Sequence, residues 1–202
     1  MSQVFLLSPA RCDGERAKLL LNPRASFELA ERVRGAGAPI GEVFSFLSGL
    51  YFRGKLGYAR AFGNRGHGEP SVFIITTDRG LVSPEEVVTR DDLLAFATVD
   101  IATADSRYHD PLRRDVADLA HMLGHRSRAV LLGSIATGKY VDALLAGFGS
   151  RLVFPRDFVG RGDMSRGGLL LRCVREQREL DYVPVEGAVR RGKLPPRLAP
   201  ER

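Results

Sequence analysis

The chain has 202 residues, of which 44% are hydrophobic, and it carries a formal net charge of +6. Its length predicts one domain, and the lack of any run of about 18 consecutive apolar residues excludes a membrane-spanning helix. The opening stretch MSQVFLLSPARCDGE has no basic segment before its short apolar run, so we expect no signal peptide and a cytoplasmic protein. Two cysteines, Cys12 and Cys173, are too few for a disulfide framework or a four-cysteine zinc site. The positive charge favours a polyanionic partner such as nucleic acid.

The first half of the chain predicts strands and helices in alternation. Residues 4–7 form a short apolar run that Ser8 and Pro9 end, which indicates a buried strand. The β-branched segment SVFIITT, residues 71–77, predicts a central strand. Apolar residues at helical spacing predict helices over residues 25–33, 51–62 and 90–97.

The second half continues this pattern. We expect a helix over residues 111–123, with Pro111 at its first position and Asp110 as its N-cap. Further elements are predicted in chain order at residues 128–133, 140–148, 151–155, 169–177 and 180–185. The alternation predicts an α/β fold: a single three-layer domain over residues 1–187 with a mainly parallel central sheet. A basic, proline-rich tail over residues 188–202 is expected to be flexible.

Ligands of parallel α/β sheets bind beyond the carboxyl ends of the strands. Four predicted strand ends carry candidate chemistry, at residues 8–10, 76–80, 133–134 and 155–162. We find no internal repeat. The pair His121 and His125 lacks the glutamate of a zinc-binding helix, so no metal or cofactor is predicted.

The segment from Gly133 to Lys139 has the spacing G-x-x-x-x-G-K of a phosphate-binding P-loop. A working P-loop follows its lysine with Ser or Thr, which holds Mg²⁺, but this chain has Tyr140 there. An acidic residue directly after a later apolar strand is also missing. We therefore expect no NTPase, but Ser134 and Lys139 remain candidates for binding a phosphate or a base edge.

Residues 46–62 interleave basic and aromatic side chains, among them Tyr51, Arg53 and Lys55. Arginine and lysine neutralise phosphates, and aromatic rings stack on unpaired bases, so these three residues are candidates for binding nucleic acid. The alternative is an amphipathic helix that buries its apolar residues and leaves its charges in solvent.

A glycine-rich loop, residues 158–168, precedes the predicted helix over residues 169–177. Its glycines allow close approach of the backbone to a ligand, and its candidate site residues are Phe158, Arg161, Asp163 and Arg166. Asp163 is a candidate catalytic carboxylate. The alternative for Asp163 is an N-cap.

Asp78 and Arg79 directly follow the predicted strand over residues 71–77, in a position where catalytic groups often lie. Asp78 is the second candidate catalytic carboxylate, and Arg79 is a candidate nucleic-acid contact. The alternative is a turn in which Asp78 accepts hydrogen bonds from nearby backbone N–H groups.

The opening VFLLSPA resembles that of the bacterial peroxide-stress DNA-binding proteins, which begin with a strand and L-L-S-P-A-K, with Arg11 at the lysine position. Residues 50–59, 79–86 and 133–144 are similar in order to three segments of a second bacterial family, although Asp78-Arg79 replaces its Lys-His. The resemblance implies an α/β core related to the uracil-DNA glycosylase superfamily and to the glycosylase-like part of archaeosine synthase. The motifs G-Q-D-P-Y and G-x-N-P-G of the glycosylases are absent.

From this resemblance and the basic segments we expect a DNA-binding enzyme that hydrolyses the N-glycosidic bond of a modified or damaged base, in repair or in defence against foreign DNA. Asp78 or Asp163 would stabilise the positive charge that develops on the sugar. Tyr51 or Phe158 would stack on the base, and basic residues would hold phosphates. The alternatives are a non-catalytic stress-response DNA-binding protein and a nucleotide or phosphoribosyl enzyme. The expected partner is DNA, without a membrane partner, and the sequence predicts no oligomeric state.

Overall fold

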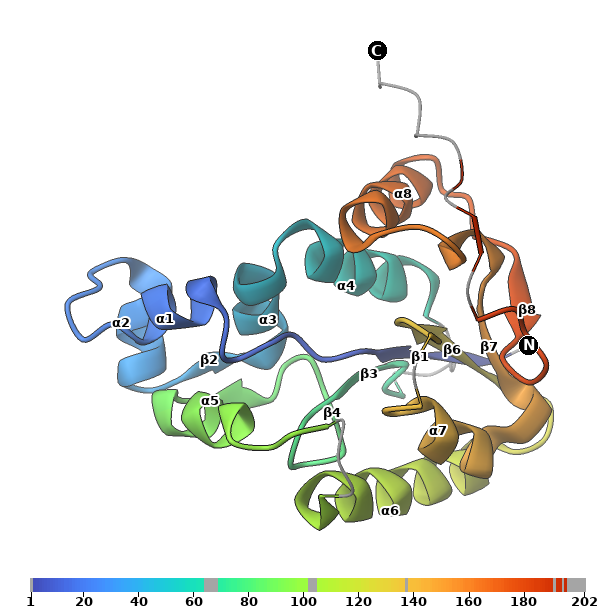
Figure 1. The fold of residues 1–202 in the computed structure, drawn as a ribbon, viewed down its shortest axis with the longest axis horizontal. Helices are drawn as coiled ribbons and strands as arrows, with labels where there is room; N and C mark the ends of the chain where they lie inside the picture. The colour runs from blue at the N-terminus through green and yellow to red at the C-terminus, as the bar shows by residue number, and fades with distance from the viewer. Residues whose placement is uncertain are drawn as a thin grey trace.

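The computed structural model describes residues 2–63, 69–101, 105–136, 138–190, 192–193 and 195. They form an α/β fold in which helices cover both faces of a six-stranded sheet (Figure 1). Helices α4 and α8 lie on one face, and α6 and α7 lie on the other. The expected arrangement of three layers, a sheet between two layers of helices, is therefore confirmed.

The strands follow one another across the sheet in the order β4 (Leu81–Val82), β3 (Val72–Ile75), β1 (Gln3–Leu7), β6 (Arg128–Leu132), β7 (Leu152–Pro155) and β8 (Tyr182–Pro184). The helices are α1 (Glu15–Leu21), α2 (Glu28–Arg34), α3 (Ile40–Ser48), α4 (Leu50–Phe62), α5 (Arg90–Ala97), α6 (Ser106–Leu123), α7 (Val141–Phe148) and α8 (Asp163–Arg175). Short 3-10 helices span Gly149–Arg151 and Arg156–Phe158, and a small ribbon pairs β2 (Ala38–Pro39) with β5 (Val87–Val88).

The sheet is mixed, so the prediction of a mainly parallel sheet is wrong. The four inner strands run parallel to one another, whereas both edge strands, β4 and β8, are antiparallel to their neighbours. Between β3 and β4 the cause is the connection: a turn over residues 76–80 can reverse the chain but cannot hold the crossover that a parallel pair needs. The fully buried, apolar β1 lies in the middle, as expected for a strand covered on both faces.

Three predicted boundaries are corrected. Helix α6 begins at Ser106 and not at Pro111, because Asp105 accepts a hydrogen bond from the backbone N–H of Arg107 (3.0 Å) and acts as the N-cap in place of Asp110. Helix α8 begins at Asp163, six residues before its predicted start. Helix α1 was not predicted, and helix α2 begins at Glu28, three residues after its predicted start.

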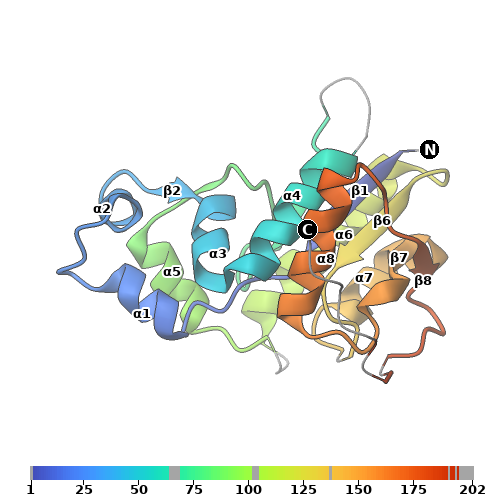
Figure 2. The ribbon, with the colours of Figure 1, turned by 90° about the horizontal axis from the view of Figure 1, so that it is seen from above.

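Helices α4 and α8 cross at a pair of glycines, and this crossing positions the candidate site. A Cβ atom added to Gly54 would lie 2.7 Å from the carbonyl oxygen of Gly167, so only glycine permits this approach. Figure 2 shows the two helices side by side, and α1, α2, α3 and α5 grouped beyond the carboxyl ends of the inner strands. The carboxyl edge of the sheet therefore faces a second layer of helices.

The predicted tail, residues 188–202, is described at residues 188–190, 192–193 and 195 only, and the rest lies outside the described residues. Gly192 and Lys193 lie against Gly160. Among the described residues there is no helix with the length and apolar character of a membrane span.

Candidate active site

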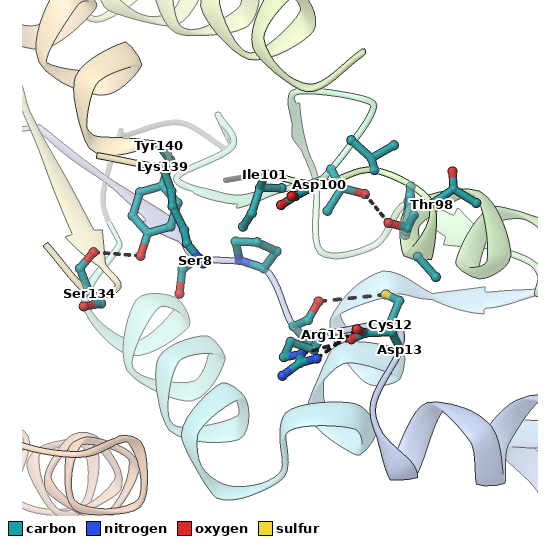
Figure 3. A pocket seen from close by; sticks show the side chains of 16 residues that line it. Ser8, Arg11, Cys12, Asp13, Thr98, Asp100, Ile101, Ser134, Lys139 and Tyr140 are labelled. Atoms are coloured by element: carbon teal, nitrogen blue, oxygen red, sulfur yellow. Dashed lines mark hydrogen bonds and ion pairs between the residues drawn. The ribbon is translucent and has the colours of Figure 1, made fainter. Parts of the chain in front are cut away.

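Two cavities open at the carboxyl ends of β1 and β6. We call the first the Lys55 cavity; it has a volume of about 680 Å³, and its lining includes Ser8, Arg16, Tyr51, Lys55, Tyr140 and Asp163. We call the second the Cys12 cavity; it has a volume of about 630 Å³, and its lining includes Ser8, Cys12, Phe96, Ile101, Lys139 and Tyr140 (Figure 3). Both volumes lie within the range of about 300–1,000 Å³ typical of small-molecule sites.

Lys55 is buried, with 1% of its surface exposed, although the sequence suggested a phosphate contact in solvent. Its Nζ donates to the backbone oxygen of Ser8 (2.6 Å) and to Ser8 Oγ (2.9 Å). Nζ also lies over the rings of Tyr51 and Phe52, at 4.7 and 4.6 Å from their centroids. The Lys55 amine is therefore held at the end of β1, on the wall of the cavity.

Burial lowers the pKa of Lys55 to about 7, because removal from water disfavours the ammonium form. The negative charge of Asp163 opposes this change, and the positive charge of Arg166 adds to it. At neutral pH both forms of the amine are populated, so Lys55 can donate or accept a proton near neutral pH.

Tyr140 occupies the position after the P-loop-like lysine and closes the turn. Its hydroxyl donates to the backbone oxygen of Ser134 (2.8 Å), and a Cβ atom on Gly133 would lie 2.8 Å from that hydroxyl. Burial raises the pKa of Tyr140, while hydrogen bonds with Ser8 and Ser134 oppose the rise. A phenol therefore stands at the sequence position of the Mg²⁺-binding hydroxyl of a P-loop, and it is hydrogen-bonded to the backbone of the turn.

Tyr51 contributes a buried polar atom to the Lys55 cavity. Its hydroxyl has no hydrogen-bond partner among the described residues, and burial raises its pKa above the ordinary value. Buried polar groups in folded proteins are nearly always hydrogen-bonded. The nearby Arg166 side chain interacts with this hydroxyl and opposes the rise of its pKa.

Asp163 brings a carboxylate to the same cavity. Its side chain is 71% exposed and lies 3.6 Å from the Arg166 guanidinium. The N-cap of α8 is Gly162, so Asp163 is the first helical residue and does not act as the cap. Arg166 itself donates to the backbone oxygen of Phe158 (3.2 and 3.0 Å), which commits its guanidinium to the fold.

Phe158 is buried beneath Arg166 and packs edge-on against Tyr51 (6.4 Å between ring centroids), so its ring supports the site and is not open to a base. Arg161 donates to Ser165 Oγ (3.2 Å). Arg53 is exposed on α4, two positions before Lys55, and helical geometry directs the two side chains apart. The expected basic residues therefore do not form one surface.

Asp78 and Arg79 lie apart from the Lys55 cavity. Arg79 pairs with Asp92 and with Asp78 (3.6 Å), and its guanidinium lies over the ring of Phe96. Asp92 in turn forms a capping box with Thr89 at the start of α5. Burial raises the pKa of Asp78, which lines a separate hollow of about 490 Å³. The structure thus gathers Tyr51, Lys55, Ser134 and Asp163, and separates them from Asp78 and Arg79.

The sequence predicts candidate chemistry at the strand end over residues 8–10 but no role for Ser8, and it indicates Tyr140 only as a residue that cannot hold Mg²⁺. One feature of the sequence could have indicated Ser8 as a site residue: it is a small polar residue directly after the first apolar run. The partners of Ser8 could not be identified, since Lys55 lies 47 residues away in the chain.

No group of three or more metal-ligating side chains occurs among the described residues. Comparisons with protein-family models, with curated proteins and with solved structures gave no match. The relation to glycosylase-like proteins stays a prediction from the sequence motifs.

Proposed function

We propose that this protein hydrolyses the N-glycosidic bond of a modified or damaged base in nucleic acid, and that the reaction takes place in the Lys55 cavity. The observation that carries the proposal is the meeting of two groups on one cavity wall: an amine whose pKa is lowered to about 7, and the carboxylate of Asp163. Cleavage of this bond needs a proton for the departing base and a negative charge near the sugar.

In the proposed reaction, the bond between C1′ and the base nitrogen breaks and the bonding electrons leave with the base. The Lys55 ammonium gives a proton to that nitrogen, and the Asp163 carboxylate stabilises the positive charge on the sugar. Water adds to C1′ and returns a proton to the Lys55 amine.

The test is mass spectrometry of free bases released from a panel of modified DNAs. We expect Asp163→Asn to slow single-turnover release by about a hundredfold or more. Asp78→Asn is the matched control and should react at the wild-type rate, because Asp78 lines neither cavity at the strand ends. Binding without release of any base would favour the non-catalytic DNA-binding alternative, and full activity of Asp163→Asn would remove the carboxylate from the mechanism.

One distance favours a second candidate. Ser8 Oγ lies 2.9 Å from Lys55 Nζ, which is the arrangement of a serine nucleophile and a lysine base. The two candidates predict opposite pH dependence. A Lys55 ammonium that donates a proton loses activity as pH rises through about 7, whereas a neutral Lys55 amine that accepts the Ser8 proton gains activity over the same range. Covalent labelling of Ser8 by a fluorophosphonate probe, lost in Ser8→Ala, would support the serine enzyme.

A further inference from the structure

The two cavities at the strand ends share part of their lining, and we call the two together the cleft. Both are lined by Ser8, by Arg11 and, from the β6–α7 turn, by Ser134 and Tyr140. Residues 8–11 and 13 of one loop line both cavities, and Figure 3 shows this loop beside Tyr140 and Lys139. Each part has the volume of a complete small-molecule site, so the cleft is larger than one nucleoside requires.

The Cys12 cavity has the lining of a site for a flat, partly apolar group. Phe96, Val99 and Ile101 form its apolar wall, and burial raises the pKa of the Cys12 thiol to about 12, so that wall carries no thiolate charge at neutral pH. A heterocyclic base has an apolar face that such a wall can cover.

Two exposed cations, Arg11 and Lys139, line the Cys12 cavity together with the carboxylates of Asp13 and Asp100. The Arg11 side chain is 83% exposed and lies on the wall that the two cavities share, with Asp13 as its ion-pair partner. Lys139 is exposed at the Cys12 cavity and makes no hydrogen bond or ion pair with the described part of the chain. A phosphodiester that joins two nucleotides in neighbouring cavities passes beside Arg11.

We infer that the cleft binds single-stranded nucleic acid, with the reacting nucleotide in the Lys55 cavity and its neighbour in the Cys12 cavity. This inference rests on the proposed function for the identity of the reacting nucleotide. The loop that lines both cavities separates two adjacent bases, so neither keeps its stacking or pairing. Binding of a strand that is already single requires less unstacking and unpairing energy than binding of a duplex does.

The first experiment measures binding of a short fluorescein-labelled DNA strand of mixed sequence by anisotropy. Ala97→Trp narrows the Cys12 cavity from an exposed position at the end of α5, and the control Ala95→Trp lies on the same helix outside both cavities. We expect Ala97→Trp to weaken binding about tenfold or more, which is the effect of losing one stacked base, and Ala95→Trp to bind as the wild type does. Equal effects of the two substitutions, or a hairpin duplex that binds as tightly as the single strand, would overturn the inference.

The second experiment compares base release from mononucleotides and dinucleotides that carry the same modified base. We expect a larger kcat/KM for the dinucleotide, and in Ala97→Trp a ratio of dinucleotide to mononucleotide kcat/KM near one. Equal kcat/KM for both substrates overturns the inference and leaves the proposed function intact. If no substrate releases base, the proposed function fails, and the anisotropy comparison alone decides whether the cleft binds a strand.

Discussion

Replacement of Lys55 by Met should change how the stability of the protein depends on pH. Lys55 has a pKa of about 7 in the folded protein and an ordinary value of 10.5 in the unfolded chain. Between these values the unfolded chain holds about one more proton than the folded protein, so the free energy of unfolding rises with pH. Below about pH 7 both states are protonated and this contribution no longer changes.

The size of the effect follows from the same two values. Each pH unit between them contributes about 1.4 kcal/mol. Between pH 6 and pH 9, Lys55 should therefore raise the free energy of unfolding of the wild type by about 2.5 kcal/mol. Lys55→Met lacks this contribution, while the other titrating groups, common to both proteins, contribute equally.

The assay is urea unfolding followed by circular dichroism at pH 6 and pH 9, because the chain contains no tryptophan. The quantity compared is the change between the two pH values, which cancels the hydrogen bonds to Ser8 that the substitution removes. Lys18→Met is the control, since Lys18 is exposed in α1 and pairs with Glu15 on the surface. A pH-dependent change in Lys55→Met within about 0.5 kcal/mol of the wild-type change would refute the argument that burial controls this amine.

Three further predictions concern packing, thiol chemistry and capping. Gly54→Ala should lower the free energy of unfolding in urea by about 1–3 kcal/mol, because the added methyl group meets the backbone of Gly167. The control Gly57→Ala, in the same helix, meets a side-chain carbon at 3.9 Å and should be neutral or stabilising. Equal losses in the two variants would contradict the close crossing of α4 and α8 at these glycines. Burial is the main cause that raises the pKa of the Cys12 thiol to about 12. In a Cys173→Ser background, iodoacetamide at pH 8 should therefore alkylate Cys12 at least about a hundredfold more slowly in the folded protein than in urea. Comparable rates would show that the thiol is accessible. Thr89→Ala removes the capping box of α5 and should lower the free energy of unfolding by about 1 kcal/mol, whereas an unchanged value would show that the cap contributes nothing.

The sequence by itself determined those helices and strands whose residues all favour the same secondary structure. The apolar run of β1, the helix from Leu50 to Phe62 and the helix from Arg90 to Ala97 were all predictable within one residue, because the hydrophobic pattern of each lies inside its own segment. The location of candidate chemistry at the strand ends followed from the alternation of strands and helices. The direction of the edge strands did not follow, since a strand has the same side-chain pattern in either direction.

Only the tertiary structure decided what the basic residues do. Arg53 and Lys55 look alike in the sequence, yet one is exposed and the other is buried against Ser8. Likewise, Asp78 and Asp163 are both candidate carboxylates in the sequence, but only Asp163 shares a cavity with Lys55. The reason is that the close approach of α4 to α8 at Gly54 and Gly167 turns Lys55 toward the end of β1. Burial, which sets the pKa of an amine, depends on such contacts between segments far apart in the chain.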